Sequence, residues 1–261
     1  MKLFIFCLLF VVCHADVTHD AAGTRINVLG QSGKVRITRV DKVITMQVDY
    51  LHEVDASGNT VGQAGSGKHS VNSFATQAFT FTPLKELSYQ NVSMQEFTFA
   101  TDVHSIGKLK IVTMMVEEAS SVATETETWS VARGDIKWNI ELSDWTFCDP
   151  CSDGTATYID IGIEIKSTKS EKKNNTIDLG DATLQLSNRV QVDGIEGDMP
   201  SGYPKIVSQG SKELFIFRFP KFSQKVVYDP LLQLSATTSP ASMPSYKQWL
   251  LALLFSLYCL T

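Results

Sequence analysis

Two runs of alternating residues, separated by a short loop, constrain the fold of this chain more than any other feature. In the first run (136–143, IKWNIELS), one set of alternate residues is apolar and most of the other set is polar. The second run (158–166, YIDIGIEIK) places isoleucines at four alternate positions. A period of two is that of a β-strand with one buried and one wetter face. The two runs therefore predict two strands whose apolar sides contribute to a core.

Shorter runs of the same kind fill much of the remaining chain. Residues 43–51 alternate, and the alternation puts Ile44, Met46, Val48 and Tyr50 on one face. Residues 108–117 are apolar on both faces, which is typical of a central strand. Polar, glycine-rich stretches at 55–70 and 194–210 separate such runs, and we expect them to be loops.

No window has a helical period apart from two terminal apolar segments. About ten strands with turn-rich connections predict an all-β protein built as an antiparallel β-sandwich, with a jelly roll as one form of it. Because the chain has no internal repeat and no linker, we expect a single extracellular domain over residues 16–235. The net charge of -5 is mild and argues against a nucleic-acid partner.

The N-terminus has the pattern of a secretory signal peptide. Lys2 precedes an apolar stretch at 3–12, and residues 13–15 (CHA) place small side chains where a signal peptidase reads them. We expect cleavage after Ala15, so that residues 1–15 are removed. An uncleaved anchor is the alternative, although this apolar stretch is shorter than a membrane span.

The C-terminus carries a second apolar segment, residues 249–260, which ends one residue before the chain does. As a helix it would extend about 18 Å, against about 30 Å for the hydrocarbon core of a bilayer. Small polar residues precede it at 235–242 (SATTSPAS), as in a glycosylphosphatidylinositol signal. We therefore expect Ser235 to carry a lipid anchor and residues 236–261 to be the hydrophobic anchor signal. A short transmembrane anchor is the alternative.

The cysteine count predicts one disulfide. Cys7 and Cys13 leave with the signal peptide, and Cys259 leaves with the tail if that is removed. Outside the cell, Cys148 and Cys151 are then expected to pair with each other. Redox sites share this spacing, but here strands rather than a helix flank the pair and an aspartate lies within it, which disfavours a reactive thiolate.

Other motifs point to a glycosylated protein that is not an enzyme. Sequons at Asn91 (NVS) and Asn174 (NNT) predict N-linked glycans. Residues 62–68 come close to a phosphate-binding loop, but His69 stands where a magnesium-binding Ser or Thr is required, so we interpret them as part of a hairpin loop. The scattered histidines lie in no catalytic or zinc-binding motif. We expect no cofactor other than weakly bound calcium.

Acidic residues near the two central runs are the best candidates for a binding site. If the two strands pair, Glu141, Asp160 and Glu164 share one polar face of the sheet. Clustered carboxylates supply the hard oxygen ligands that calcium prefers, so the three residues predict a weak calcium or mineral contact. The alternative is a solvated charged face on which Lys137 and Lys166 pair with the acids.

Trp145 has the opposite phase to Trp138, which shares the apolar face of its strand. Two interpretations of Trp145 stand side by side. It is either a platform on which a ligand stacks or a cap over the end of the sandwich.

Residues 136–148 (IKWNIELSDWTFC), followed by 158–166 (YIDIGIEIK), resemble the acidic and aspartic-acid-rich skeletal organic matrix proteins of stony corals. Those proteins have a similar strand that ends in an aromatic-x-Phe-Cys segment, then a strand that mixes isoleucines with acids. The resemblance implies a secreted or membrane-tethered protein of a calcified matrix, whose partners are matrix proteins or calcium carbonate mineral. This chain lacks the long aspartate runs of the richer members, which favours matrix organisation or adhesion over direct mineral nucleation.

The sequence thus leads to two functional hypotheses. The first is a non-enzymatic, membrane-tethered component of a skeletal organic matrix, which acts in biomineralisation through weak acidic contacts with calcium or mineral. The alternative is a cell-surface adhesion or lectin-like receptor domain, which binds a glycan or a protein through Trp145 and the loop around Cys148 and Cys151.

Overall fold

A computed structural model of the chain describes residues 16–63, 68–123, 128–209 and 212–234. The predicted signal peptide (1–15), the predicted lipid site Ser235 and the predicted anchor signal (236–261) lie outside the described residues. Every regular element in the described ranges is a β-strand, so the expected all-β fold is confirmed. Those ranges contain no helix that is long and apolar enough to cross a membrane.

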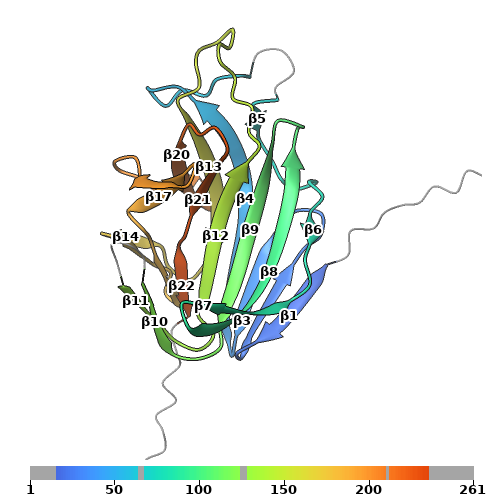
Figure 1. Cartoon of the computed structure of the whole chain (residues 1–261), viewed down its shortest axis with the longest axis vertical. Coiled ribbons are helices and arrows are strands. Elements are labelled where there is room, and N and C mark those ends of the chain that lie inside the picture. Colours follow the sequence, from blue (N-terminus) through green and yellow to red (C-terminus); the bar gives the residue numbers. More distant parts are fainter. Residues whose placement is uncertain (1–15, 64–67, 124–127, 210–211, 235–261) are drawn as a thin grey trace, which may run out of the picture.

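Eight strands form the first sheet, in the spatial order β1-β2-β3-β4-β13-β20-β19, with β5 beside β4 (Figure 1). Their bounds are β1 Val17–Ala21, β2 Thr24–Val28, β3 Val35–Arg39, β4 Lys42–Val54, β5 Ser70–Val71, β13 Tyr158–Lys166, β19 Lys205–Gln209 and β20 Lys212–Pro220. β13 lies between β4 and β20 and is buried on both faces over most of its length.

Twelve strands form the second sheet. Its main path is β14-β15-β16-β22-β12-β21-β17-β18, and β12 also pairs with β9, which leads on to β8, β7 and β6. Their bounds are β6 Thr80–Phe81, β7 Lys85–Tyr89, β8 Val92–Val103, β9 Gly107–Val116, β12 Ile136–Ser143, β14 Glu171–Lys173, β15 Thr176–Asp178, β16 Ala182–Gln185, β17 Arg189–Val192, β18 Ile195–Asp198, β21 Lys225–Tyr228 and β22 Leu231–Leu234. The predicted central strand at 108–117 is confirmed, because β9 lies between β8 and β12.

The main core lies between the two large sheets. The alternating apolar residues of β12 and the isoleucines of β13 all belong to this one buried cluster, as both runs predicted. A second, smaller cluster includes Met94, Met114 and Leu231, and it is covered by a separate hairpin of β10 (Ser120–Ala123) and β11 (Thr128–Val131). Antiparallel sheets packed face to face agree with the predicted sandwich.

β12 and β13 do not pair with each other, and they lie in different sheets. β12 pairs with β9 on one side and with β21 and β22 on the other, whereas β13 pairs with β4 and β20. The segment 144–157 between them therefore crosses from one sheet to the other at the end of the sandwich. Pairing of the two consecutive strands as a hairpin, which is the simplest arrangement, is therefore not observed.

A bulge in β4 changes which of its side chains face the core. Gly162 of β13 lies opposite Tyr50, but the next residue, Ile163, lies opposite Val48, so Asp49 is an extra residue. An extra residue shifts the side-chain alternation by one position. Tyr50 therefore leaves the face of Val48 on which the sequence pattern placed it, and Glu53 turns towards the interior, where its exposed fraction is 0%.

The long stretch 194–210 contains two strands where we expected only a loop. β18 pairs with β17 alone, and β19 pairs with β20 alone. Edge strands need only one partner and carry a weak apolar pattern, which explains why the sequence did not reveal them.

Candidate functional site

Two loops meet at one end of the sandwich and form the candidate site, which we call the tip. One is the segment 144–157 with its Cys148–Cys151 disulfide, and the other follows β4 and contains residues 55–63 and 68–69. In Figure 1 both loops lie at the top, at the opposite end from the label of β22, which pairs with the first residues of β12. The predicted disulfide is present.

Glu53, at the end of β4, holds the two loops together. Its carboxylate accepts hydrogen bonds from the indole Nε1 of Trp145 at 2.8 Å and from the backbone N–H of Cys148 at 2.9 Å. The Nδ1 of His69 lies 2.7 Å from Oε1 of the same carboxylate. A buried carboxylate is tolerated only when hydrogen bonds or a positive charge replace its hydration, and these contacts do so.

A second carboxylate joins the loops closer to the solvent. Asp153 accepts hydrogen bonds from the backbone N–H groups of Gly62 at 2.8 Å and Gln63 at 3.1 Å. Asp149 forms an ion pair with Lys221, with Nζ and Oδ2 2.6 Å apart. The tip is thus a surface whose backbone is fixed by side-chain carboxylates.

Trp145 is a structural residue of the tip. Its exposed fraction is 5%, and its ring lies so close to Gly107 that an added Cβ there would come within 2.2 Å of Cε3. An aromatic platform needs one open ring face, so the prediction of a ligand platform at Trp145 is wrong. The alternative, a cap over the end of the sandwich, is what the burial shows.

The three predicted calcium ligands are not brought together. Glu141 lies on β12 in the twelve-stranded sheet, and both of its oxygens accept hydrogen bonds from Nζ of Lys110, at 3.0 and 3.1 Å. Asp160 and Glu164 lie on β13 in the other sheet, with exposed fractions of 7% and 6%. The shared polar face is therefore wrong, since it required the two strands to pair. Calcium binding by these side chains stays a prediction.

The alternative interpretation, in which cations pair with these acids, fits the observed contacts better. Asp160 accepts two hydrogen bonds of 2.7 Å from Arg218, and Nζ of Lys166 lies 3.1 Å from Oε1 of Glu164. The bond to Asp160 raises the pKa of the Arg218 guanidinium. Burial, reinforced by the charge of Asp160, raises the pKa of Tyr50, which packs over Gly162 on the same face. The predicted partner Lys137 pairs instead with Asp229, at 2.9 Å.

Among the described residues, no group of three or more His, Cys, Asp and Glu side chains could hold a metal ion.

Both predicted glycosylation sites occupy accessible positions. Asn91 lies in the turn between β7 and β8, and Asn174 lies in the turn between β14 and β15, and both are exposed. Glycosylation of these residues stays a prediction.

Sequence reasoning missed Glu53 and His69, the two residues that organise the tip. In a strictly alternating strand, Glu53 would lie on the face opposite Ile44 and Met46, where an acid needs no explanation. Only the bulge at Asp49 turns it inward. The one available signal was the adjacent pair Tyr50 and Leu51, which breaks the alternation of β4 but does not by itself identify a bulge.

The chain was then compared with known proteins. A family model described as acidic skeletal organic matrix protein matches residues 12–178 and 170–261. The two matched ranges overlap and together include the β-domain and the anchor-like end, but only the last residues of the signal-like end. No solved structure matches the chain.

Proposed function

Since this chain belongs to the acidic skeletal organic matrix protein family, we propose that it is a non-enzymatic component of a calcified extracellular matrix, tethered to a membrane by its C-terminal tail. The family match over nearly the whole chain is the observation that carries this proposal. Membership in a skeletal matrix family implies an extracellular protein, in agreement with the predicted signal peptide.

The position of Leu234, the last described residue, supports a tethered orientation. Asp135 accepts a hydrogen bond from the N–H of Leu234 at 3.2 Å, and Arg39 donates one to the carbonyl oxygen of Leu234 at 3.2 Å. These bonds fix the last residue of β22, a strand that Figure 1 shows at the end opposite the tip. A tail that enters a membrane from there leaves the tip directed towards the matrix.

We infer that contacts with calcium or mineral are weak and multivalent rather than made at one tight site. The net charge of -5 supports a general attraction for cations. Asp144 and Asp149 are exposed acids of the tip, and we expect them to contact a mineral surface. Glu141, Asp160 and Glu164 would contribute less, because their paired carboxylates are largely buried, whereas the carboxylate of Asp149 stays about half exposed beside Lys221.

Adsorption of the secreted protein to calcium carbonate particles tests this mechanism. We expect binding that falls as salt rises from about 0.15 M to about 1 M, because the screening length falls from about 8 Å to about 3 Å. Asp144→Asn with Asp149→Asn should weaken adsorption more than the matched pair Asp41→Asn with Glu86→Gln, which removes the same charge elsewhere on the surface. Equal effects of the two pairs, or adsorption insensitive to salt, would count against a mineral-facing tip.

A calorimetric calcium titration at about 0.15 M salt tests for a discrete site. We expect no saturable heat, and no change when Glu141, Asp160 and Glu164 become Gln, Asn and Gln. A stoichiometric heat lost in that triple variant would instead establish the calcium site that the sequence predicted.

The tether is tested separately, on cells that express the full chain. A phospholipase specific for glycosylphosphatidylinositol should release the protein into the medium, and replacement of Ser235 together with the small residues that follow it should abolish surface display. Protein that stays on the membrane after the enzyme treatment would support the short transmembrane anchor. Protein found only in the medium of untreated cells would refute the tether.

The alternative role as an adhesion or lectin-like receptor domain needs a different binding surface. Trp145, its proposed platform, is buried. A glycan-binding role would have to use another part of the molecule.

A further inference from the structure

The outer face of β2, β3 and β4 carries a basic hollow on a protein whose net charge is negative. The hollow has a volume of about 430 Å³ and is lined by Asn27, Leu29, Lys34, Arg36, Val43 and Thr45. No carboxylate lines it. Arg36 is exposed, and Val43 has an exposed fraction of 37%, so the face is open to solvent.

Strand register places three of these side chains, those of Asn27, Arg36 and Thr45, in one cross-strand row, and we call this row together with Lys34 the basic ladder. Thr18, Asn27, Arg36, Thr45 and Lys166 are successive cross-strand partners from β1 to β13. Neighbouring strands lie about 4.8 Å apart, so Arg36 and Lys166 are about 10 Å apart along the row. Lys34 precedes Arg36 by two residues, which places it about 7 Å away on the same face.

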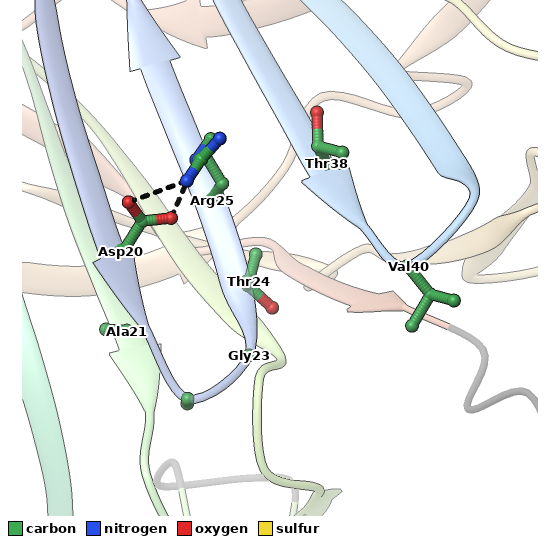
Figure 2. A pocket seen from close by; sticks show the side chains of 8 residues that line it. Asp20, Ala21, Gly23, Thr24, Arg25, Thr38 and Val40 are labelled. Carbon is green, nitrogen blue, oxygen red and sulfur yellow. Dashed lines mark hydrogen bonds and ion pairs between the residues drawn. The ribbon is translucent and has the colours of Figure 1, made fainter.

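The two cations of the hollow, Lys34 and Arg36, differ in their ion pairing from Arg25, the cation of the adjacent hollow. Figure 2 shows that hollow, of about 380 Å³, at the turn between β1 and β2, where Arg25 donates hydrogen bonds to Asp20 at 2.8 and 3.2 Å. Arg25 is thus already neutralised. No acid among the described residues lies within ion-pair distance of Lys34 or Arg36, so their charge is available to an incoming anion.

We propose that the basic ladder binds a sulfated or otherwise acidic polysaccharide. Lys34 and Arg36 would contact its anionic groups, while Asn27 and Thr45 would hydrogen bond to its hydroxyls. Leu29 and Val43 would support the apolar face of a sugar ring.

Two observations favour a glycan over an acidic polypeptide. The hollow interleaves amide and hydroxyl groups with the cations, as the polar surface of a sugar requires. It lacks the apolar and aromatic core that a protein interface has. Both predicted glycosylation sites, Asn91 and Asn174, lie in turns of the other sheet, so glycans attached there would leave this face uncovered.

The test is binding of the full chain, purified in a mild detergent, to an immobilised heparin oligosaccharide at about 0.15 M salt. The ladder variant is Lys34→Glu with Arg36→Glu. Its control is Lys108→Glu with Lys225→Glu, which changes the net charge equally at exposed positions of the other sheet. A milder pair, Lys34→Gln with Arg36→Gln, guards against misfolding of the reversed variant.

We expect the ladder variant to bind about tenfold more weakly or worse, and the control to stay within about twofold of the natural chain. Thr45→Val should weaken heparin binding but leave any binding to polyaspartate unchanged. Equal losses in the ladder and control variants, or no binding to heparin, would overturn the proposal. Polyaspartate bound as tightly as heparin, with Thr45→Val silent for both, would replace the glycan with an acidic polypeptide. The assay contains neither mineral nor membrane, so its outcome is independent of the proposed matrix tether.

Discussion

Removal of the Glu53 carboxylate is the most informative perturbation of the tip, because that group is fully buried and hydrogen bonded across two loops. Glu53→Ala leaves the indole N–H of Trp145 and the backbone N–H of Cys148 without acceptors. Each buried donor left unsatisfied costs about 1–3 kcal/mol. With the small cavity added, we expect a loss of about 3–5 kcal/mol in the free energy of unfolding.

Glu53→Gln removes the negative charge of the side chain but keeps nearly the same shape, so it separates the two contributions. The amide keeps one acceptor oxygen and nearly the same volume, but its NH₂ group must face at least one of the former donors. We expect a loss of about 1–3 kcal/mol, less than for alanine. Glu141→Ala is the matched control, since it breaks a partly exposed ion pair with Lys110 and should cost about 0–1 kcal/mol.

Urea unfolding followed by tryptophan fluorescence measures these losses, with the slope against urea required to stay constant. Hydrogen exchange at the Cys148 amide reports whether the tip opens locally before the sandwich unfolds. A Glu53→Ala variant within about 1 kcal/mol of the natural chain, with the Cys148 amide still protected, would refute the argument that Glu53 organises the tip.

Three further predictions concern the outer face of β13 and the edge of the sandwich. Asp160→Ala leaves the Arg218 charge half-buried without its partner, and should cost about 3 kcal/mol in urea unfolding; a loss near zero would mean that water solvates Arg218 adequately. Gly162→Ala places a Cβ 2.3 Å from Cε1 of Tyr50 and should cost about 1–3 kcal/mol, and Tyr50→Ala should relieve most of that cost in a double-mutant cycle; additive losses would contradict the clash. Burial lowers the pKa of His19, so the unfolded chain protonates first and stability should fall as the pH drops below about 6.5. His19→Gln should reduce that fall between pH 7.5 and 5.5 in urea titrations, and an unchanged pH profile would assign the effect to other groups.

Local patterns predicted the strands of the core correctly because side-chain alternation is a local property. The isoleucines of β13 and the apolar residues of β12 are buried as their period of two requires. The disulfide followed from two cysteines in a short loop. Family membership also followed from a local signature, the segment that contains both strands.

The candidate sites could not be predicted in the same way, because each depends on which strands become neighbours. Glu141, Asp160 and Glu164 share a face only if β12 and β13 pair, and pairing is decided by the competition of β9, β20 and β4 for the same edges. A crossover between sheets leaves no mark in the alternation of either strand. The cross-strand row of the basic ladder is likewise visible only once the register of five strands is known.

The sequence by itself determined the all-β class, the residues of β12 and β13 that face the core, the disulfide and the extracellular family. These properties depend on composition and on near neighbours in the chain. Only the tertiary structure decided that Trp145 is buried, that Glu53 points inward and that the predicted calcium ligands are separated. The physical reason is that one extra residue in β4 reverses the faces of the strand beyond it, and one crossover places consecutive strands in different sheets.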